Sequence, residues 1–280
     1  MSAFPLAGGR EHPAEPPTAN LQSRAPLRGE THSLLMAAVK SALAQPGRRE
    51  HSVAGRIVLT PDGQPIRSVL TGRKRNMTGK YASRKAGRSQ VFESHNELAF
   101  YQECEVDPRV VDYRAQPFRF EFVLDGQLRR YIPDCVRLLD SGRIEVVEVK
   151  ADSRYLHDVD YSCKVSQVAK ICTMIGWTLA FVVGERIHLP RVRRENVKLI
   201  QQDRMVLFDE RHVYGARAAL AERGGEGPFG EIASAIEAPP KGDAILRALM
   251  VARLVQIDLE APLTAHSAVR AYSRLIEGEV

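Results

Sequence analysis

The chain has 280 residues, of which 44% are hydrophobic and 26% are charged, and its net charge is +6. This composition is ordinary for a folded globular protein, and the length suits one domain of common size with a smaller second one. No apolar run approaches the ~20 residues that cross a bilayer, and the Pro- and Ala-rich start lacks the charged-then-apolar order of a signal peptide, so the sequence predicts a cytoplasmic protein.

The positive charge is concentrated in one segment. Residues 53–90 hold nine Lys and Arg against Asp62 alone, a local charge of +8, so the rest of the chain sums to −2. A block this basic predicts contact with a phosphate backbone; a solvated arm that orders only on DNA is compatible with the same pattern. The basic residues expected to bind DNA are Arg73, Lys74, Arg75, Lys80, Arg84, Lys85 and Arg88.

The first third of the chain predicts little regular structure. Residues 1–30 are rich in Pro, Ala and Gly, and residues 46–90 are basic and rich in turn-forming residues. Between them, apolar residues at helical spacing predict one short helix over 32–44. A short strand is expected at 56–60, ahead of a Pro-Asp-Gly turn.

Continuous regular structure is expected to begin near Ser94. Ser94 and Glu97 have the spacing of a capping box, and apolar residues follow at helical spacing, which predicts a helix over 94–105. Phenylalanines then alternate with other residues over 118–124, which predicts a strand that turns at Asp125-Gly126. Further strands are expected at 128–132, 135–139 and 144–150.

An amphipathic helix is expected over 161–175, followed by a buried strand at 178–183 and a helix near 193–203. The order helix, strands, helix, strand predicts an α/β fold with a mixed sheet flanked by helices.

The character of the sequence changes near residue 210. Helices are expected at 211–222 and 243–254, separated by a Gly- and Pro-rich stretch, with a short strand at 255–259 and a closing helix over 264–272. This pattern resembles a small helical, winged-helix-like module. The expected division is a disordered N-terminal region over 1–50, a basic DNA-binding arm over 51–90, a main domain over 91–207 and a C-terminal domain over 208–280.

The four cysteines have no CxxC pair and no zinc-ligand spacing with a histidine. Most of them lie within an apolar pattern. They are therefore expected to be small buried thiols rather than metal ligands or nucleophiles.

The strand at 144–150 carries the first chemical signal. Because residues two apart share one face of a strand, Glu148 and Lys150 emerge together at the end of an otherwise mostly apolar segment. Charged groups beside a core are costly unless they are paired or bound to a metal. An ion pair at a strand end is the plainer interpretation of these residues alone.

Asp134 strengthens the chemical interpretation. It follows Pro133 and lies 14 residues before Glu148, with the Ser141-Gly142 turn midway, so a hairpin would place it beside Glu148 and Lys150. Pro-Asp, a hairpin and Glu-x-Lys form the pattern of the PD-(D/E)xK nuclease core.

Glu97 is the fourth candidate. Phe100, Tyr101 and Cys104 follow Glu97 at helical spacing, so Glu97 shares the inward face of its helix. A capping box with Ser94 would also explain a glutamate at this position. Asp134 and Glu148 are the predicted Mg²⁺ ligands, with Glu97 a direct or water-mediated third, and Mn²⁺ is expected to substitute. Lys150 is the predicted cation that orients or deprotonates the attacking water.

Several short motifs run in a fixed order between residues 75 and 205. They are Gly79-Lys80-Tyr81-Ala82-Ser83-Arg84-Lys85, Phe92-Glu93-Ser94-His95-Asn96-Glu97, Asp107-Pro108, Gln116-Pro117, Tyr131-Ile132-Pro133-Asp134 and Glu148-Val149-Lys150. Together they resemble the TnsA-like endonuclease subunit of heteromeric transposases.

The resemblance implies a restriction-endonuclease-like fold in which Glu97, Asp134, Glu148 and Lys150 match the catalytic positions. The family often has Gln at the position of Glu148. The resemblance also implies a bacterial enzyme that cuts the 5′ (non-transferred) strand at transposon ends in double-stranded DNA. Its partners would be an integrase-like transposase and an AAA+ regulatory ATPase, which the C-terminal winged-helix-like module would engage.

Two other functions remain open from the sequence. The chain could be a different PD-(D/E)xK enzyme, such as a stand-alone restriction or phage repair nuclease, which would cut DNA alone with its own sequence preference. It could also be a non-catalytic DNA-binding scaffold on the same fold. The presence of all four candidate site residues argues against the scaffold.

Overall fold

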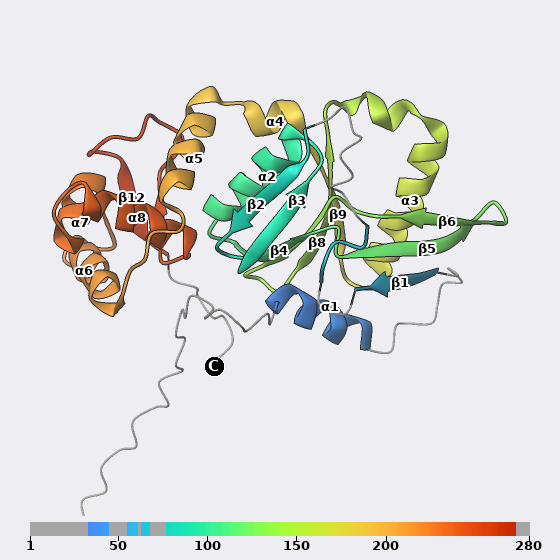
Figure 1. Cartoon of the computed structure of the whole chain (residues 1–280), viewed down its shortest axis with the longest axis horizontal. Helices are drawn as coiled ribbons and strands as arrows, with labels where there is room; N and C mark the ends of the chain where they lie inside the picture. The colour runs from blue at the N-terminus through green and yellow to red at the C-terminus, as the bar shows by residue number, and fades with distance from the viewer. Residues whose placement is uncertain (1–32, 45–54, 61–62, 68–76, 273–280) are drawn as a thin grey trace, which may run out of the picture.

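The computed structural model describes residues 33–44, 55–60, 63–67 and 77–272, which form a mixed α/β protein (Figure 1). The helices are α1 (Leu34–Ala44), α2 (His95–Val106), α3 (Val159–Met174), α4 (Gly184–His188), α5 (Arg191–Asp203), α6 (Glu210–Ala221), α7 (Phe229–Ile236) and α8 (Lys241–Val251), with a 3-10 helix, η1 (Ser153–His157). The strands are β1 (Gly55–Leu59), β2 (Gly79–Ser83), β3 (Arg88–Phe92), β4 (Val110–Ala115), β5 (Phe118–Leu124), β6 (Gln127–Tyr131), β7 (Cys135–Leu139), β8 (Ile144–Lys150), β9 (Thr178–Val183), β10 (Glu226–Pro228), β11 (Val255–Ile257) and β12 (Ala268–Ala271). None of the helices in these ranges has the length and apolar character to span a membrane.

A four-stranded sheet in the order β4-β7-β8-β9 forms the centre of the larger part of the molecule. β8 and β9 run parallel and are joined through α3, while the other neighbours are antiparallel. Alternate residues of β8 enter different cores: Val147 and Val149 pack with α2, and Ile144 and Val146 pack with α1 and α3. The sheet is therefore covered on both faces, which explains why its strands are so apolar.

The strands predicted between residues 118 and 183 are confirmed, but the strand predicted to be buried, β9, is only half-buried, with Thr178 exposed. β5 and β6 form the expected hairpin, and Asp125 and Gly126 turn it with φ angles of 50° and 70°, the left-handed conformation that a two-residue hairpin turn requires. The helices expected at 32–44, 94–105, 161–175 and 193–203 correspond to α1, α2, α3 and α5. β1 matches the strand expected at 56–60 and pairs with β5.

Regular structure begins earlier than Ser94, contrary to expectation. β2 and β3 pair as an antiparallel hairpin within the segment that was expected to be only basic and turn-rich. The buried residues of these strands are Tyr81, Ser83, Gln90 and Phe92, two of them polar, while the apolar Ala82 and Val91 are not buried. The alternation of apolar residues is therefore weak. Residues 1–32 and 45–54, which include most of the predicted disordered region, lie outside the described residues.

The C-terminal part has the order α6, β10, α7, α8, β11, β12, with a small sheet in the order β10-β12-β11. The expected closing helix over 264–272 is wrong: Val269 lies in β12 and pairs with both Gly227 and Ile257. Val269 is the one buried residue of this segment, so the segment has no helical face to bury. α7 lies in the stretch that was expected to be irregular, and its Ile232 and Ala233 are fully buried.

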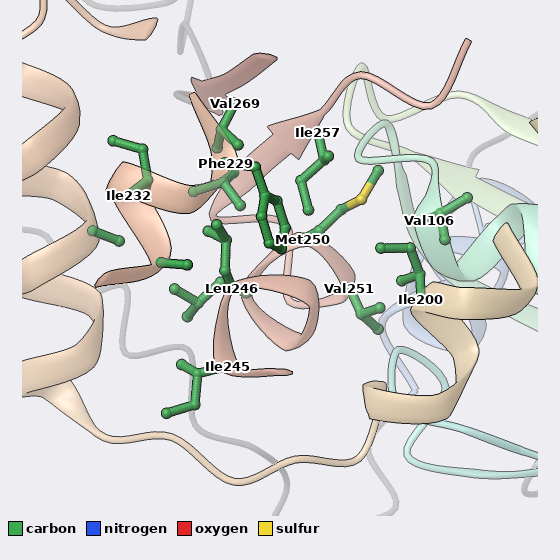
Figure 2. Close-up of a cluster of buried hydrophobic side chains, with 14 of the residues drawn as sticks. Val106, Ile200, Phe229, Ile232, Ile245, Leu246, Met250, Val251, Ile257 and Val269 are labelled. Carbon is green, nitrogen blue, oxygen red and sulfur yellow. The ribbon is translucent and has the colours of Figure 1, made fainter. Parts of the chain in front are cut away.

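The two parts share one hydrophobic core. Val106 at the end of α2 and Val197 and Ile200 of α5 belong to the same buried cluster as the apolar residues of α6, α7, α8 and the small sheet. Figure 2 shows Val106 and Ile200 facing Met250 and Val251 of α8 in this cluster. The C-terminal part is therefore packed onto the sheet domain through α2 and α5 rather than tethered by a linker.

Replacing Leu246 with alanine should test this continuity. Leu246 is fully buried in the shared core, so the cavity should lower the free energy of unfolding by about 3 kcal/mol. The single tryptophan, Trp177, lies in a different hydrophobic cluster, which it shares with residues of β5 and α3. Its fluorescence therefore follows the unfolding of that cluster in urea. Because the parts share a core, the Trp177 transition should shift together with the circular dichroism transition.

A matched control is Leu207→Ala, whose side chain is 83% exposed and whose loss should change stability by less than ~0.5 kcal/mol. A Trp177 transition that stays at the wild-type midpoint in the Leu246 variant would show that the two parts unfold independently.

Candidate active site

The polar ends of β7 and β8 bring two carboxylates together. The register that pairs Cys135 with Val147 places Asp134 beside Glu148. The backbone N–H of Val149 donates to Asp134 Oδ2 at 2.8 Å, which fixes one oxygen of this carboxylate against the neighbouring strand. The hairpin spacing read from the sequence therefore produces the expected juxtaposition.

Glu148 is the most enclosed of the candidate ligands. It is 4% exposed, and Lys150 Nζ approaches its Oε1 at 2.5 Å. The hydroxyl of Tyr131, from β6, donates to Oε2 at 2.5 Å, and the hydroxyl of Tyr161, from α3, donates to Oε1 at 3.0 Å. Three donors from three elements thus hold one carboxylate in a single orientation.

Lys150 is held by aromatic rings as well as by charge. Its ammonium lies 5.3 Å from the ring centre of Tyr155 and 5.1 Å from that of Tyr161, both within cation–π range. The Lys150 side chain is 21% exposed, so it lies between the buried Glu148 carboxylate and solvent.

Glu97 comes from the first turn of α2, on the opposite face of the sheet from Tyr161. Ser94 caps the helix by accepting from the backbone N–H of Glu97 at 3.1 Å, and its hydroxyl donates to Glu97 Oε1 at 3.1 Å. The backbone N–H of Glu93 donates to Oε2 at 2.9 Å. Glu97 therefore takes part in the helix cap and is also buried, with 6% of the residue exposed.

The charges of Glu148 and Glu97 act on the carboxyl group of Asp134. Burial, followed by the negative charges of Glu148 and Glu97, raises the pKa of Asp134 to about 8. Burial also raises the pKa of Glu97, against its hydrogen bonds from Glu93 and Ser94. Like charges held this close in a poorly solvated site are the environment that a cation relieves.

The structure adds a cation that the sequence did not single out as part of the site. Arg67 follows β1, and its Nη2 lies 2.5 Å from Glu93 Oε2 while its Nε donates to Gln116 Oε1 at 3.0 Å. Gln116 is buried and adopts a φ of 46°, a strained conformation for a residue other than glycine, and its backbone N–H donates to the carbonyl of Asp134 at 3.3 Å. Arg67 is thus tied to the segments that carry both Glu97 and Asp134.

Two of the predicted DNA-binding residues are used inside the protein. Lys85 Nζ donates to the carbonyls of Cys104 and Asp107 at 2.8 and 2.5 Å, and burial lowers its pKa to about 8. Arg84 donates to the carbonyls of Arg204 and Val206. We therefore assign Arg84 and Lys85 a structural role.

The other predicted DNA-binding residues differ in position. Lys80 is exposed on β2, and Arg88 is half-buried on β3. Arg73, Lys74 and Arg75 lie outside the described residues. Of the four cysteines, Cys104, Cys135 and Cys172 are buried as expected, while Cys163 is exposed.

A divalent cation at this site would be held by few protein ligands. Among the described residues, no three His, Cys, Asp or Glu side chains already stand as a metal-binding group. Asp134 and Glu148 nevertheless offer hard oxygen donors side by side, and Mg²⁺ is commonly bound by one or two carboxylates with water and phosphate oxygens completing its shell. The donor set fits such an ion, with Glu97 near enough to act electrostatically on Asp134.

No family model matches the chain, and no curated protein matches it.

Proposed function

We propose that the chain is a metal-dependent DNA endonuclease of the PD-(D/E)xK type. The observation that carries the proposal is the meeting of Asp134, Glu148 and Lys150 at one end of the β7–β8 hairpin, with Glu97 close enough to raise the pKa of Asp134. Two carboxylates beside a lysine match what phosphodiester hydrolysis needs, namely cation ligands and a positive group near the attacked phosphate.

The wider fold supports a restriction-endonuclease-like assignment. A helix carrying Glu97 leads into antiparallel strands that carry Asp134 and Glu148, and α3 then crosses to the parallel strand β9. The C-terminal order of helix, strand, two helices and two strands supports a winged-helix-like module.

In the proposed mechanism each residue has one task. Bound Mg²⁺ or Mn²⁺, held by Asp134 and Glu148 with Glu97 direct or through water, would supply a water of lowered pKa and neutralise charge on the phosphate. The Lys150 ammonium orients the attacking water by donating to it, and its positive charge stabilises the extra negative charge that develops. Tyr131 and Tyr161 keep the Glu148 carboxylate in place through their hydroxyl donors.

Arg67 is proposed to contact the scissile phosphate. Its side chain is 44% exposed and is held by bonds to Gln116 and Glu93, where its charge acts on the Glu97 carboxyl. A planar guanidinium can donate two parallel hydrogen bonds to a phosphate from a fixed fork, a geometry that an ammonium lacks.

Replacing Arg67 with methionine should lower the single-turnover cleavage rate by about 100-fold, because the variant lacks a donor to the developing charge. Duplex affinity should fall by less than tenfold, and Arg67→Lys should restore only part of the rate. The control is Arg217→Gln, an exposed arginine of α6. An Arg67→Met enzyme that cleaves at the wild-type rate but binds weakly would assign Arg67 to binding alone.

The biological role that the sequence motifs favour is cleavage of the 5′ (non-transferred) strand at transposon ends. In this proposal the chain acts beside an integrase-like transposase that cuts and joins the 3′ ends, and beside an AAA+ ATPase that regulates assembly. One carboxylate cluster serves hydrolysis of one strand, so a separate active site must join the ends.

The test is reconstitution with an Asp134→Ala subunit and strand-resolved analysis on a denaturing gel. The complex should assemble and the 3′ ends should join, while the 5′ strands stay uncut and the element remains attached to its donor. Complete excision with both strands cut would refute this role. Robust cleavage by the wild-type chain alone at its own preferred sequence would instead favour a stand-alone nuclease.

A further inference from the structure

The solvent side of the sheet β1-β5-β6 carries a group of arginines around one carboxylate. Alternate residues of β5 point into the core, and the residues between them face outward. The inward set is Phe118, Phe120 and Phe122, all at most 1% exposed. We call the outward set Arg56, Arg119, Glu121 and Arg130 the arginine face.

Glu121 lies at the centre of the arginine face. It pairs across the sheet with Arg56 of β1 on one side and with Arg130 of β6 on the other. The nearest nitrogens of Arg56 and Arg119 lie 2.7 Å from its oxygens, and that of Arg130 lies 3.4 Å away. The two nearest guanidiniums lower the pKa of Glu121.

The arginines outnumber the carboxylate that they surround. The Glu121 side chain is 1% exposed, while those of Arg56 and Arg130 are 73% and 67% exposed. Three guanidiniums and one carboxylate leave a net charge of +2 on the arginine face. Each guanidinium has five N–H donors, and a carboxylate that pins one edge leaves the other edge directed at solvent.

Satisfying Glu121 does not require this arrangement. One bidentate arginine neutralises a carboxylate, and gathering three cations within reach of it adds repulsion among them. An anionic ligand relieves that repulsion, and arginines already oriented by Glu121 lose little rotamer freedom on binding it.

The arginine face and the candidate active site share strand β6. Arg130 directly precedes Tyr131, so its side chain lies on the outward face of the strand, while the Tyr131 hydroxyl on the inward face donates to Glu148. In Figure 1 the β5–β6 hairpin stands out from the body of the protein. The exposed side chains of Arg56 and Arg130 on its outward face can therefore be reached by an extended partner.

We infer that the arginine face binds the phosphate backbone of double-stranded DNA. This inference rests on the proposed nuclease function and names the surface that holds its substrate. Backbone contacts of this kind position DNA without reading its sequence.

The test is the double variant Arg56→Gln and Arg130→Gln, which leaves Arg119 on Glu121. Binding of a labelled duplex is followed by fluorescence anisotropy in Ca²⁺ over a series of NaCl concentrations. Affinity should fall by about tenfold or more at low salt, and the slope of log affinity against log salt should flatten by about 1.8, or about 0.9 for each phosphate that the variant no longer neutralises. The matched control is Arg211→Gln with Arg217→Gln, two exposed arginines of α6.

A second variant works in the opposite direction. Glu121→Gln removes the negative charge and keeps one acceptor oxygen for the arginines, so it should bind DNA more tightly and with a steeper salt slope than wild type. A merely destabilised protein would not gain affinity.

An unchanged salt slope in the double variant, or an equal fall in affinity in the α6 control, would overturn the inference. The nuclease proposal is judged separately, by the loss of cleavage in the Asp134 variant. If Asp134-dependent cleavage persists while the arginine variants bind like wild type, only the binding surface is refuted.

Discussion

Replacing Asp134 with alanine should lower DNA cleavage in Mg²⁺ by a factor of about 10³ or more, without unfolding the protein. Asp134 is placed at the strand end by the β7–β8 register and contributes its side chain to the carboxylate cluster rather than to the apolar core. Lys150→Ala should have a comparable effect, because it removes the cation beside the reacting phosphate. Nicking of supercoiled plasmid by the reconstituted complex measures both.

The loss should be specific to chemistry. Duplex binding in Ca²⁺ should stay within a few-fold of wild type for Asp134→Ala, and the control Asp160→Ala, an exposed carboxylate of α3, should cleave normally. Wild-type nicking by the Asp134 variant would reject the assignment of the active site.

Asp134→Asn should raise stability in the absence of metal. The folded-state pKa of Asp134 is about 8 against an ordinary value of 3.8, so the unfolded chain ionises first as pH rises. The stability that the neutral carboxyl contributes is complete below about pH 4 and is lost as pH rises through 8. Asparagine stays neutral throughout, so the variant should melt several degrees higher than wild type near pH 8 and about equally near pH 4.

Added Mg²⁺ should reduce the difference in melting temperature between the variant and wild type at pH 8. The ion stabilises the ionised wild-type carboxylate, whereas the variant lacks this charged ligand. A variant that melts below wild type at pH 8 without metal would show that the carboxylates do not repel one another in the folded protein.

The second large effect concerns stability and Lys85. Its ammonium donates to the carbonyls of Cys104 and Asp107 at the end of α2 and acts on the fully buried Glu105. Lys85→Met should therefore lower the free energy of unfolding by about 3 kcal/mol, since it leaves two acceptors without this donor and a buried carboxyl without its nearby cation. Thermal and urea melts measure the change.

The comparison with Lys80 separates structure from binding. Lys80 is exposed on β2, so Lys80→Met should change stability by less than ~0.5 kcal/mol. If Lys80 contacts DNA, its variant should instead flatten the salt dependence of binding by about 0.9. A Lys85 variant with wild-type stability would return Lys85 to the set of possible phosphate ligands.

The elements that the sequence predicts well are those whose burial follows one period. The Phe-x-Phe-x-Phe alternation fixes β5, and the helical spacing of apolar residues fixes α3, because each element has one face in a core. The β2–β3 hairpin and β12 escape prediction since few of their side chains are both apolar and buried, so the period is weak.

The candidate site divides in the same way. Asp134, Glu148 and Lys150 are predictable because a single hairpin aligns them. Arg67 and Tyr161 are not, since they come from segments 67 and 27 residues away from Asp134 along the chain, and only the tertiary fold brings them near it.

The position of α2 gives the molecule a mechanical property. Glu97 lies in its first turn and Val106 at its last, about 14 Å apart along a straight helix. Val106 is embedded in the core of the C-terminal part, and Glu97 sits among the carboxylates. The helix therefore links the two regions rigidly. A partner that binds α7 or α8 and shifts the C-terminal core should also displace the Glu97 carboxylate relative to Asp134.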